Sequence, residues 1–200
     1  MKRTWIFFFL LLIVTSLSAK PKNIYRLRVA YKKKQYAFGL GPGFGCMIYP
    51  NGNDYLMYGT VTSDNSFPIT FTAEYAYNSF IGIGVFYNHY TSQIEVTDNT
   101  DPQNKNGFDY KSNTIIVRGS YHLYLGHSYF WLDPYAAAGI GFQALSNRPF
   151  GDNNIFEPNK SSFAWQVVGG FNIYPMQNIG VFVEAGFGVN IAQTGLILRF

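Results

Sequence analysis

The chain has 200 residues, of which 13% are charged and 19% are aromatic, and its formal net charge is +4. Soluble domains carry about 25% charged residues, so this composition is unusual for a soluble globular protein. The small positive charge gives no sign of a nucleic-acid partner, and a single cysteine excludes an internal disulfide. Abundant glycine and aromatic residues suit a sheet with one face in lipid and aromatic rings at the membrane interfaces.

Residues 1–19 have the three-part layout of a secretory signal peptide. Two basic residues come first, Trp5 to Val14 form an uninterrupted apolar core, and small residues follow. This core is shorter than the ~20 apolar residues that a membrane-spanning helix needs. We therefore expect cleavage near Ser18 or Ala19 rather than an uncleaved membrane anchor.

The next residues, 20–35, are basic. Within them, Asn23 to Lys34 alternates weakly and is compatible with a short extra strand or with an extension outside the sheet. Because eight strands are predicted after it, an extra membrane strand would make the count odd. We therefore interpret residues 20–35 as a basic periplasmic N-terminal extension and residues 36–200 as the barrel domain.

After residue 35, apolar residues recur at every second position, which is the pattern of β-strands. No segment shows the 3.6-residue spacing of an amphipathic helix. The alternation predicts eight strands, at about residues 36–49, 67–77, 80–94, 112–125, 133–145, 163–174, 179–190 and 195–200.

Each predicted strand has a bulky apolar face and a small or polar face. In the first strand, for example, Phe38 and Leu40 alternate with Gly39 and Gly41. The interior of a narrow barrel must hold side chains from all around the ring, so small residues suit the inner face. In hydrocarbon every backbone polar group must be paired, which a closed barrel achieves. The sequence therefore predicts an all-β fold, an eight-stranded antiparallel up-and-down transmembrane β-barrel.

The predicted connections alternate between long and short. Outer-membrane barrels have short periplasmic turns and longer external loops, so this rhythm predicts the orientation and places both chain ends in the periplasm. Residues 55–62, within the first long connection, are also compatible with a lengthened first hairpin. The last external connection, residues 191–194, is predicted to be unusually short. The long connections are 50–66, 95–111 and 146–162, and the short ones are 78–79, 126–132 and 175–178.

Five ionisable side chains are predicted to point into the barrel as a charge network. An eight-stranded barrel is just wide enough to be filled by side chains, and buried charges require partners. We expect Glu184 to meet Arg199 across the last hairpin and Glu74 to meet Arg118 across the lumen. Such pairs favour a filled lumen over a gated narrow pore. The five residues are Glu74, Arg118, His122, Glu184 and Arg199.

Many aromatic residues lie near the predicted strand ends. We interpret them as interfacial girdles that hold the barrel at its depth in the membrane, rather than as a ligand-binding patch. They are Tyr49, Tyr77, Phe80, Tyr87, Tyr90, Tyr121, Tyr124, Tyr129, Trp131, Tyr135 and Tyr174.

The sequence predicts no catalytic, cofactor-binding or metal-binding residue. Three scattered histidines and one cysteine give no metal-ligand spacing. His122 has Ser120 two residues away, but Glu184 is the one distant acid that can be nominated for a Ser-His-acid arrangement. We therefore expect a protein that is not an enzyme and has no cofactor.

Four segments carry a resemblance to a known family: FGLGPGFG in the first strand, PYAAAGIGF in the fifth, GVFVEAGFGVN in the seventh, and the closing GLILRF. With these, the chain resembles the small eight-stranded outer-membrane barrels of the OmpA, OmpX and opacity-protein type. The resemblance implies a location in the cell outer membrane, among its lipids and lipopolysaccharide. It also implies that the terminal Phe200 is part of the signal read by the barrel-assembly machinery.

Members of such families share a scaffold and differ in their loops, so the architecture alone does not assign a role. We expect a structural or surface-interaction (adhesin-like) protein whose long loops are available to an extracellular ligand. A narrow porin-like solute channel is the alternative, and a lipid A-modifying enzyme is a further one.

Overall fold

The computed structural model describes residues 31–46, 60–97, 105–125, 131–150 and 162–200. Residues 1–30, with the predicted signal peptide and most of the basic extension, lie outside this part. Within the described residues, no helix is long and apolar enough to cross a membrane. The strands are β1 (Tyr36–Cys46), β2 (Thr60–Asn65), β3 (Ile69–Ala76), β4 (Ile81–Thr97), β5 (Lys105–His122), β6 (Leu132–Phe150), β7 (Ser162–Ile173), β8 (Ile179–Gly188) and β9 (Asn190–Arg199).

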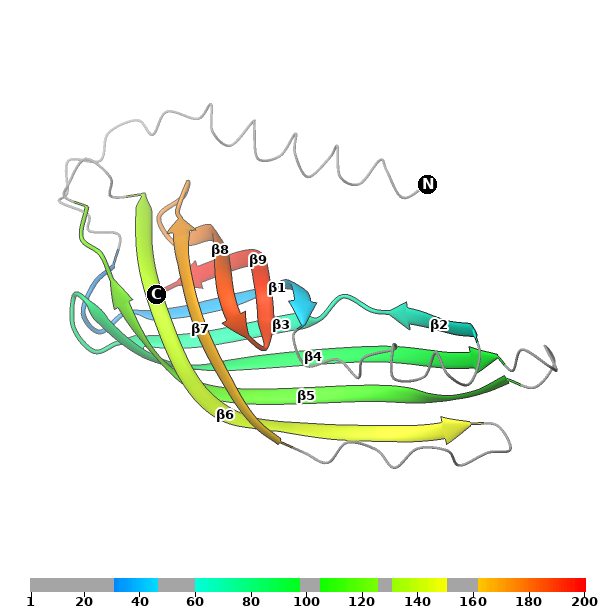
Figure 1. Cartoon of the computed structure of the whole chain (residues 1–200). Helices are drawn as coiled ribbons and strands as arrows, with labels where there is room; N and C mark the ends of the chain where they lie inside the picture. The colour runs from blue at the N-terminus through cyan, green and yellow to red at the C-terminus, as the bar shows by residue number, and fades with distance from the viewer. Residues whose placement is uncertain (1–30, 47–59, 98–104, 126–130, 151–161) are drawn as a thin grey trace.

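The strands close into a ring with eight members, as Figure 1 shows. Each strand pairs antiparallel with its neighbours in the order β1–β3–β4–β5–β6–β7–β8–β9, and β9 returns to β1. At the seam, the Tyr36 amide donates to the Phe200 carbonyl at 3.0 Å, and the Phe200 amide donates back at 2.9 Å. The predicted eight-stranded antiparallel barrel is confirmed.

β2 and β3 are two parts of one barrel strand. Both pair with β4: β2 with its last six residues, and β3 with the stretch that ends at His89. Pro68, which has no amide hydrogen, lies in the break between them. Ser66 bridges the break, because its hydroxyl contacts the Thr91 hydroxyl at 2.8 Å. Residues 60–65 were predicted to be part of a loop, which is wrong. The suggested strand at 55–62 is found for residues 60–62, but these residues pair with β4 and not with β1.

Several strands are longer than predicted. β9 begins at Asn190 rather than at residue 195, so the predicted external connection 191–194 is wrong. β4, β5 and β6 have 17, 18 and 19 residues, whereas β8 and β9 have 10 each. In Figure 1, β4, β5 and β6 extend, together with β2, well beyond β1, β3 and β7–β9. The predicted loops 95–111 and 146–162 are therefore wrong for residues 95–97, 105–111 and 146–150. The Asp, Asn, Pro and Gly residues between positions 98 and 109 are typical of loops, and they outweighed the two-residue alternation that continues through Ile94 and Val96.

The two faces of the barrel wall have opposite character. In β3, Ile69 and Phe71 are exposed, while Thr70, Thr72 and Glu74 are buried. The same alternation holds along the predicted membrane part of every strand, as expected. Val189 is on the apolar side of the alternation in the predicted strand 179–190 and was expected to face outward, but it is fully buried. Gly188 has a φ of 114°, and this left-handed residue ends β8 and breaks the alternation after it.

The β3–β4 and β7–β8 connections lie at the same end as the start of β1 and the end of β9, and we call this the turn end. The opposite end is the loop end, where Val189 alone connects β8 to β9. The β3–β4 turn is local in origin. The Asn78 side-chain oxygen accepts hydrogen bonds from the amides of Phe80 and Ile81 at 2.8 and 2.7 Å. An Asx turn of this kind reverses the chain within four residues.

Candidate functional site: the side chains inside the barrel

Long polar side chains inside the barrel lie beside glycines on neighbouring strands. Glu74, Gly84, Arg118, Gly139 and Gln166 follow one another in a single cross-strand ladder over five strands. Because glycine has no side chain, each long residue has room to extend across the narrow lumen. The small inward residues of the sequence thus create the space that the charged ones fill.

A buried ion pair crosses the middle of the lumen. Arg118 Nη1 donates to Glu184 Oε1 at 2.9 Å and to Oε2 at 3.2 Å, and both residues are at most 5% exposed. The Tyr135 hydroxyl donates to the same carboxylate, and so does the Gln193 amide. Three donors from three other strands therefore converge on one carboxylate, which satisfies a charge that would be very unfavourable alone in a low-dielectric interior.

A second cluster lies nearer the turn end, around His122. Its Nε2 is 3.0 Å from Glu74 Oε1, and its Nδ1 is 2.8 Å from Asp133 Oδ1. The Ser120 hydroxyl donates to Glu74 Oε2 at 2.6 Å, and the Asn172 amide donates to Asp133 Oδ2 at 2.9 Å. Since both ring nitrogens face carboxylates, this geometry suits an imidazolium ring that donates on both sides.

Tyr31 covers this cluster from the turn end. It precedes β1, but its ring lies inside the barrel, 7% exposed, and stacks on the His122 ring with centroids 3.5 Å apart and planes 9° apart. A side chain at Gly82 would collide with the Tyr31 hydroxyl, so the glycine makes room for it. Burial, followed by the charge of Glu74, raises the pKa of the Tyr31 hydroxyl well above its usual range, which keeps the ring neutral.

Little space is left between these side chains. A cavity of about 20 Å³ lies among Tyr31, Glu74, Arg118 and Tyr135, which is room for roughly one water molecule. Toward the loop end, an apolar cluster of Phe86, Ile116, Ala164 and Val189, all fully buried, occupies the lumen. At these levels the interior is therefore packed rather than open.

Comparison with known proteins agrees with this architecture. No protein-family model matches the sequence, and no curated protein matches it. Among solved structures, the N-terminal β-barrel domain of Pseudomonas aeruginosa OprF matches with a TM-score of 0.51 and 12% identity, over 84% of this chain and 98% of that chain. The fold is that of a small outer-membrane β-barrel.

Two further outer-membrane barrels match with lower TM-scores. The outer membrane protein OprG of Pseudomonas aeruginosa gives 0.49 at 15% identity, over 86% of this chain and 99% of that chain. The attachment invasion locus protein Ail of Yersinia pestis gives 0.43 at 10% identity, over 84% of this chain and 99% of that chain.

In this outer-membrane-type barrel the two predicted charge pairs are wrong, although all five predicted residues are buried inside. Glu184 lies opposite Gln193, so Arg199 is six residues, or about 20 Å, farther along β9. Arg199 instead lies 3.7 Å from the centroid of the Tyr174 ring. Glu74 makes its hydrogen bonds to the His122 cluster rather than to Arg118.

Sequence reasoning missed four members of the site, one of which, Gln193, was assigned to the connection 191–194. Asp133 and Tyr135 are an even number of positions from Gly139 on β6, so they lie on the same, inward face of the strand. Consistent use of the two-residue period would therefore have placed them in the lumen. Tyr135 was assigned instead to the interfacial girdle. Tyr31 carried no signal, because it lies before the first strand in a segment without clear alternation.

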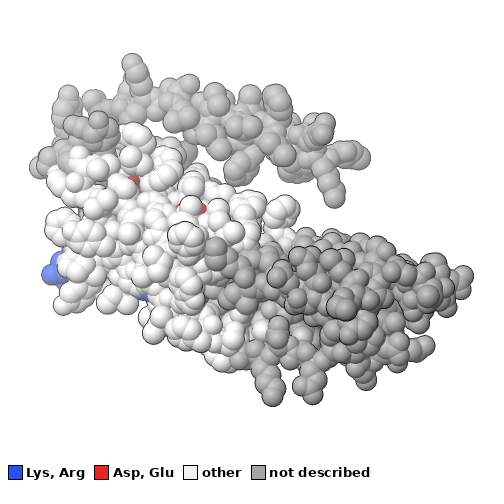
Figure 2. Space-filling model, in the orientation of Figure 1, with Lys and Arg blue, Asp and Glu red and all other residues white. Residues whose placement is uncertain are grey.

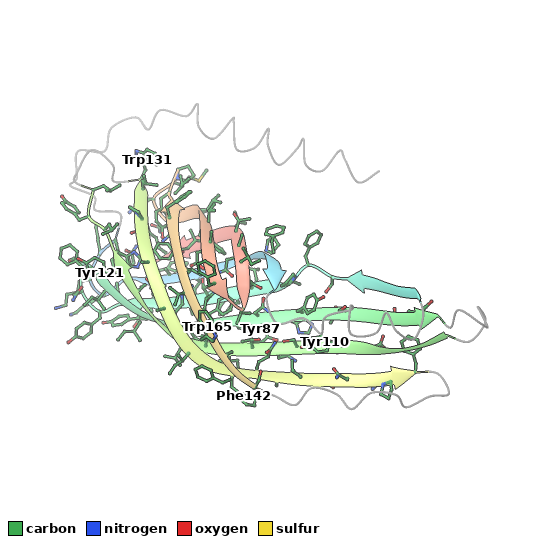
Figure 3. The ribbon with its side chains drawn as sticks, viewed as in Figure 1. Tyr87, Tyr110, Tyr121, Trp131, Phe142 and Trp165 are labelled. Atoms are coloured by element: carbon green, nitrogen blue, oxygen red, sulfur yellow. The ribbon has the colours of Figure 1, made fainter. Side chains whose placement is uncertain are left out.

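The predicted girdle is only partly correct. Tyr77, Phe80, Tyr121, Tyr124 and Trp131 are exposed near the turn end, and Figure 3 shows Tyr121 and Trp131 there. Three other members are buried inside the barrel, so their assignment is wrong, and Tyr87 is partly buried. The buried residues are Tyr90, Tyr135 and Tyr174, and the predicted members Tyr49 and Tyr129 lie outside the described residues.

Ser120, His122 and Asp133 have the spacing of a hydrolase triad. The Ser120 hydroxyl is 3.1 Å from His122 Nε2, and Asp133 contacts Nδ1. However, Glu74 contacts both the serine and Nε2, so the histidine has no free lone pair with which to accept the serine proton. Ser120 is 4% exposed, and Tyr31 covers the ring. Among the described residues, no group of three His, Cys, Asp or Glu side chains could hold a metal ion.

Proposed function

We propose that this chain is an outer-membrane protein with a closed lumen and a structural or surface-interaction (adhesin-like) role. The packed interior carries the proposal. The Arg118–Glu184 pair spans the lumen, Tyr31 covers its turn end, and the cavity between them holds roughly one water molecule. Such an interior favours a scaffold over a solute channel.

The apolar outer wall supports the location. Residues in contiguous ladders, such as Val85, Val117 and Ile140, are 42–63% exposed, which is unusual for a soluble protein and suited to lipid. With the short turns in the periplasm, the long hairpins lie outside the cell. Outer-membrane lipid and lipopolysaccharide are then the immediate partners. The exposed Phe200 at the end of β9 suits recognition by the barrel-assembly machinery.

The extended strands support the surface role. β4, β5 and β6 pair with one another up to Thr97–Lys105 and Gly107–Phe150, well beyond the last β6–β7 pair, Gln143–Ser162. They form a sheet that extends beyond the barrel at the loop end, to the right in Figure 1. A sheet of this kind offers backbone and side-chain groups to an extracellular ligand at a distance from the membrane.

A conductance experiment tests the closed lumen. The purified chain in planar bilayers should show no steady single-channel current, and Tyr31→Ala, which removes the cover from the His122 cluster, should remain silent because the ion pair and the apolar cluster still fill the lumen. Steady channels from the unaltered protein would contradict the closed lumen and favour the narrow channel.

A shortened hairpin tests the surface role in the same proposal. Ser92 and Tyr110 are direct cross-strand partners, so an Asn-Gly turn can replace residues 93–109 while the remaining β4–β5 pairs keep their register. The replacement also removes the β4 partners of residues 60–64 in β2, so it shortens the whole extended part of the sheet. Cells that carry this variant should lose adhesion to collagen-, laminin- or fibronectin-coated wells relative to cells with the full chain. If cells with the full chain, cells with the shortened hairpin and cells that lack the gene all adhered equally, the surface-interaction role would be excluded and a purely structural role would remain.

The triad-like geometry is the specific observation in favour of an enzyme, and we propose that the protein is not one. A lipid A-modifying activity would need the Ser120 hydroxyl to reach an acyl chain, and the serine is enclosed with Glu74 and Tyr31. Mass spectra of lipid A from cells with the full chain and with Ser120→Ala should be identical. An acyl change that Ser120→Ala abolishes would establish the enzyme.

A further inference from the structure

The basic residues of this chain are unevenly distributed. Seven of its 15 lysines and arginines lie within residues 20–34, a segment without aspartate or glutamate. The described members, Lys32, Lys33 and Lys34, are all exposed at the turn end. In Figure 2, the Lys and Arg atoms visible on this face gather at that end.

The backbone holds these three lysines in a fixed position on the rim. The Lys34 amide donates to the Ala76 carbonyl at 2.8 Å, and the Ala76 amide donates to the Gln35 carbonyl at 2.8 Å. The Lys32 amide donates to the Gln35 side chain at 3.1 Å. Tyr31, which directly precedes the three lysines, is buried in the lumen and fixes the start of the turn. The turn is therefore attached to the barrel on both sides.

A recess opens beside this turn. It has a volume of about 250 Å³ and is lined by the three lysines, Gln35, Gln177, Asn178, Arg199 and Phe200. No acidic side chain is among these residues. Ammonium, guanidinium and amide groups around one recess are the donors that bind phosphate oxygens in proteins.

The recess borders the apolar wall. Tyr36 and Phe200, which pair at the β1–β9 seam, are 52% and 69% exposed, and Tyr77 at the nearby β3–β4 turn is 61% exposed. Aromatic rings of this kind mark the level of lipid headgroups, and lysines beside them extend their ammonium groups toward the headgroup phosphates. The recess therefore lies where the phosphates of the adjacent leaflet are within reach.

We propose that Lys32, Lys33 and Lys34 form a binding site for the phosphate groups of anionic phospholipids in the periplasmic leaflet. Arg199, which is 6% exposed and lies over the Tyr174 ring, adds positive charge to the recess without itself binding the lipid. This inference rests on the proposed membrane location and orientation. The site attaches residues 32–34 to the membrane surface. Tyr31 holds the segment on the lumen side of the barrel rim, and lipid phosphate binds it on the outer side. The barrel would then select its lipid neighbours at the turn end.

The test measures lipid selectivity of the full chain in phosphatidylcholine vesicles, with spin-labelled phosphatidylglycerol as the probe. At low salt each basic side chain near a membrane surface contributes up to about a fivefold preference for anionic lipid. Lys32→Gln with Lys33→Gln should therefore reduce the phosphatidylglycerol preference several-fold. The matched control is Lys111→Gln with Arg148→Gln, which removes two exposed charges at the loop end and should retain the preference.

Several outcomes overturn the inference. They are an unaltered preference in the Lys32/Lys33 variant, an equal loss in the control, and displacement of the lipid by inorganic phosphate at constant ionic strength, which would indicate a free-phosphate site. Binding of peptidoglycan sacculi that depends on Lys32 and Lys33, without lipid selectivity, would identify a different partner. Carbonate extraction of the same vesicles separates the two proposals: a protein that washes off overturns the membrane location, whereas one that stays without selectivity overturns this site alone.

Discussion

Replacement of Glu184 with leucine should destabilise the folded barrel by about 3–5 kcal/mol, because it leaves the Arg118 guanidinium buried without its counter-charge. The Tyr135 hydroxyl and the Gln193 amide lose the same acceptor. Urea unfolding in detergent micelles or lipid vesicles, followed by heat-modifiable migration on a gel, measures the change in the free energy of unfolding.

The companion variant tests whether the effect comes from the pair. Glu184→Leu combined with Arg118→Met removes both charges and replaces them with apolar side chains of similar length, so most of the lost stability should return. Lys111→Met, on the exposed face of β5, is the control and should change stability by less than about 0.5 kcal/mol. A double variant as unstable as Glu184→Leu alone would show that the two residues are not energetically coupled.

Val117→Arg should destabilise the inserted barrel by about 2–4 kcal/mol, the cost of an arginine on the lipid face near the bilayer midplane. Val117 is 60% exposed in the middle of β5, and its cross-strand neighbours on the outer wall, Val85 and Ile140, are apolar as well. The measurement is the urea midpoint for unfolding from lipid vesicles.

Gln93→Arg provides the matched control for this prediction. Gln93 is exposed on β4 in the part of the sheet that extends beyond the barrel, so its replacement should have little effect. Equal midpoints for the two variants would mean that the wall around Val117 does not face lipid, and the proposed membrane location would then be wrong.

The alternation of side chains made the barrel predictable from the sequence. Between Ile69 and Ala76, and again between Thr114 and His122, successive side chains alternate between the outer wall and the lumen, so strand type, facing and count follow from the two-residue period. The error in β4 and β5 has a different source. Residues 98–109 are rich in Asp, Asn, Pro and Gly, which are typical of turns, so residues 105–109 were assigned to a loop although they are paired in a hairpin.

The site was less predictable than the fold. The two-residue period of the strands predicts that the side chains of Glu184 and Arg118 point into the lumen. Their contact, however, joins β8 and β5, which are not neighbours in the ring. No local pattern reports which side chains meet across a lumen, because that depends on the stagger between all the intervening strands. Tyr31 was out of reach for a different reason, since its position is set by stacking on His122 rather than by any strand.

The seam between β1 and β9 has a consequence for biogenesis. It joins the first and last strands of the domain, so the edges of β1 and β9 stay unpaired until the whole domain has been synthesised. Contacts between residues so far apart form slowly, because the whole intervening chain must be ordered before they can form. With the proposed outer-membrane location, we expect the polypeptide to depend on chaperones that shield these edges until β9 pairs with β1.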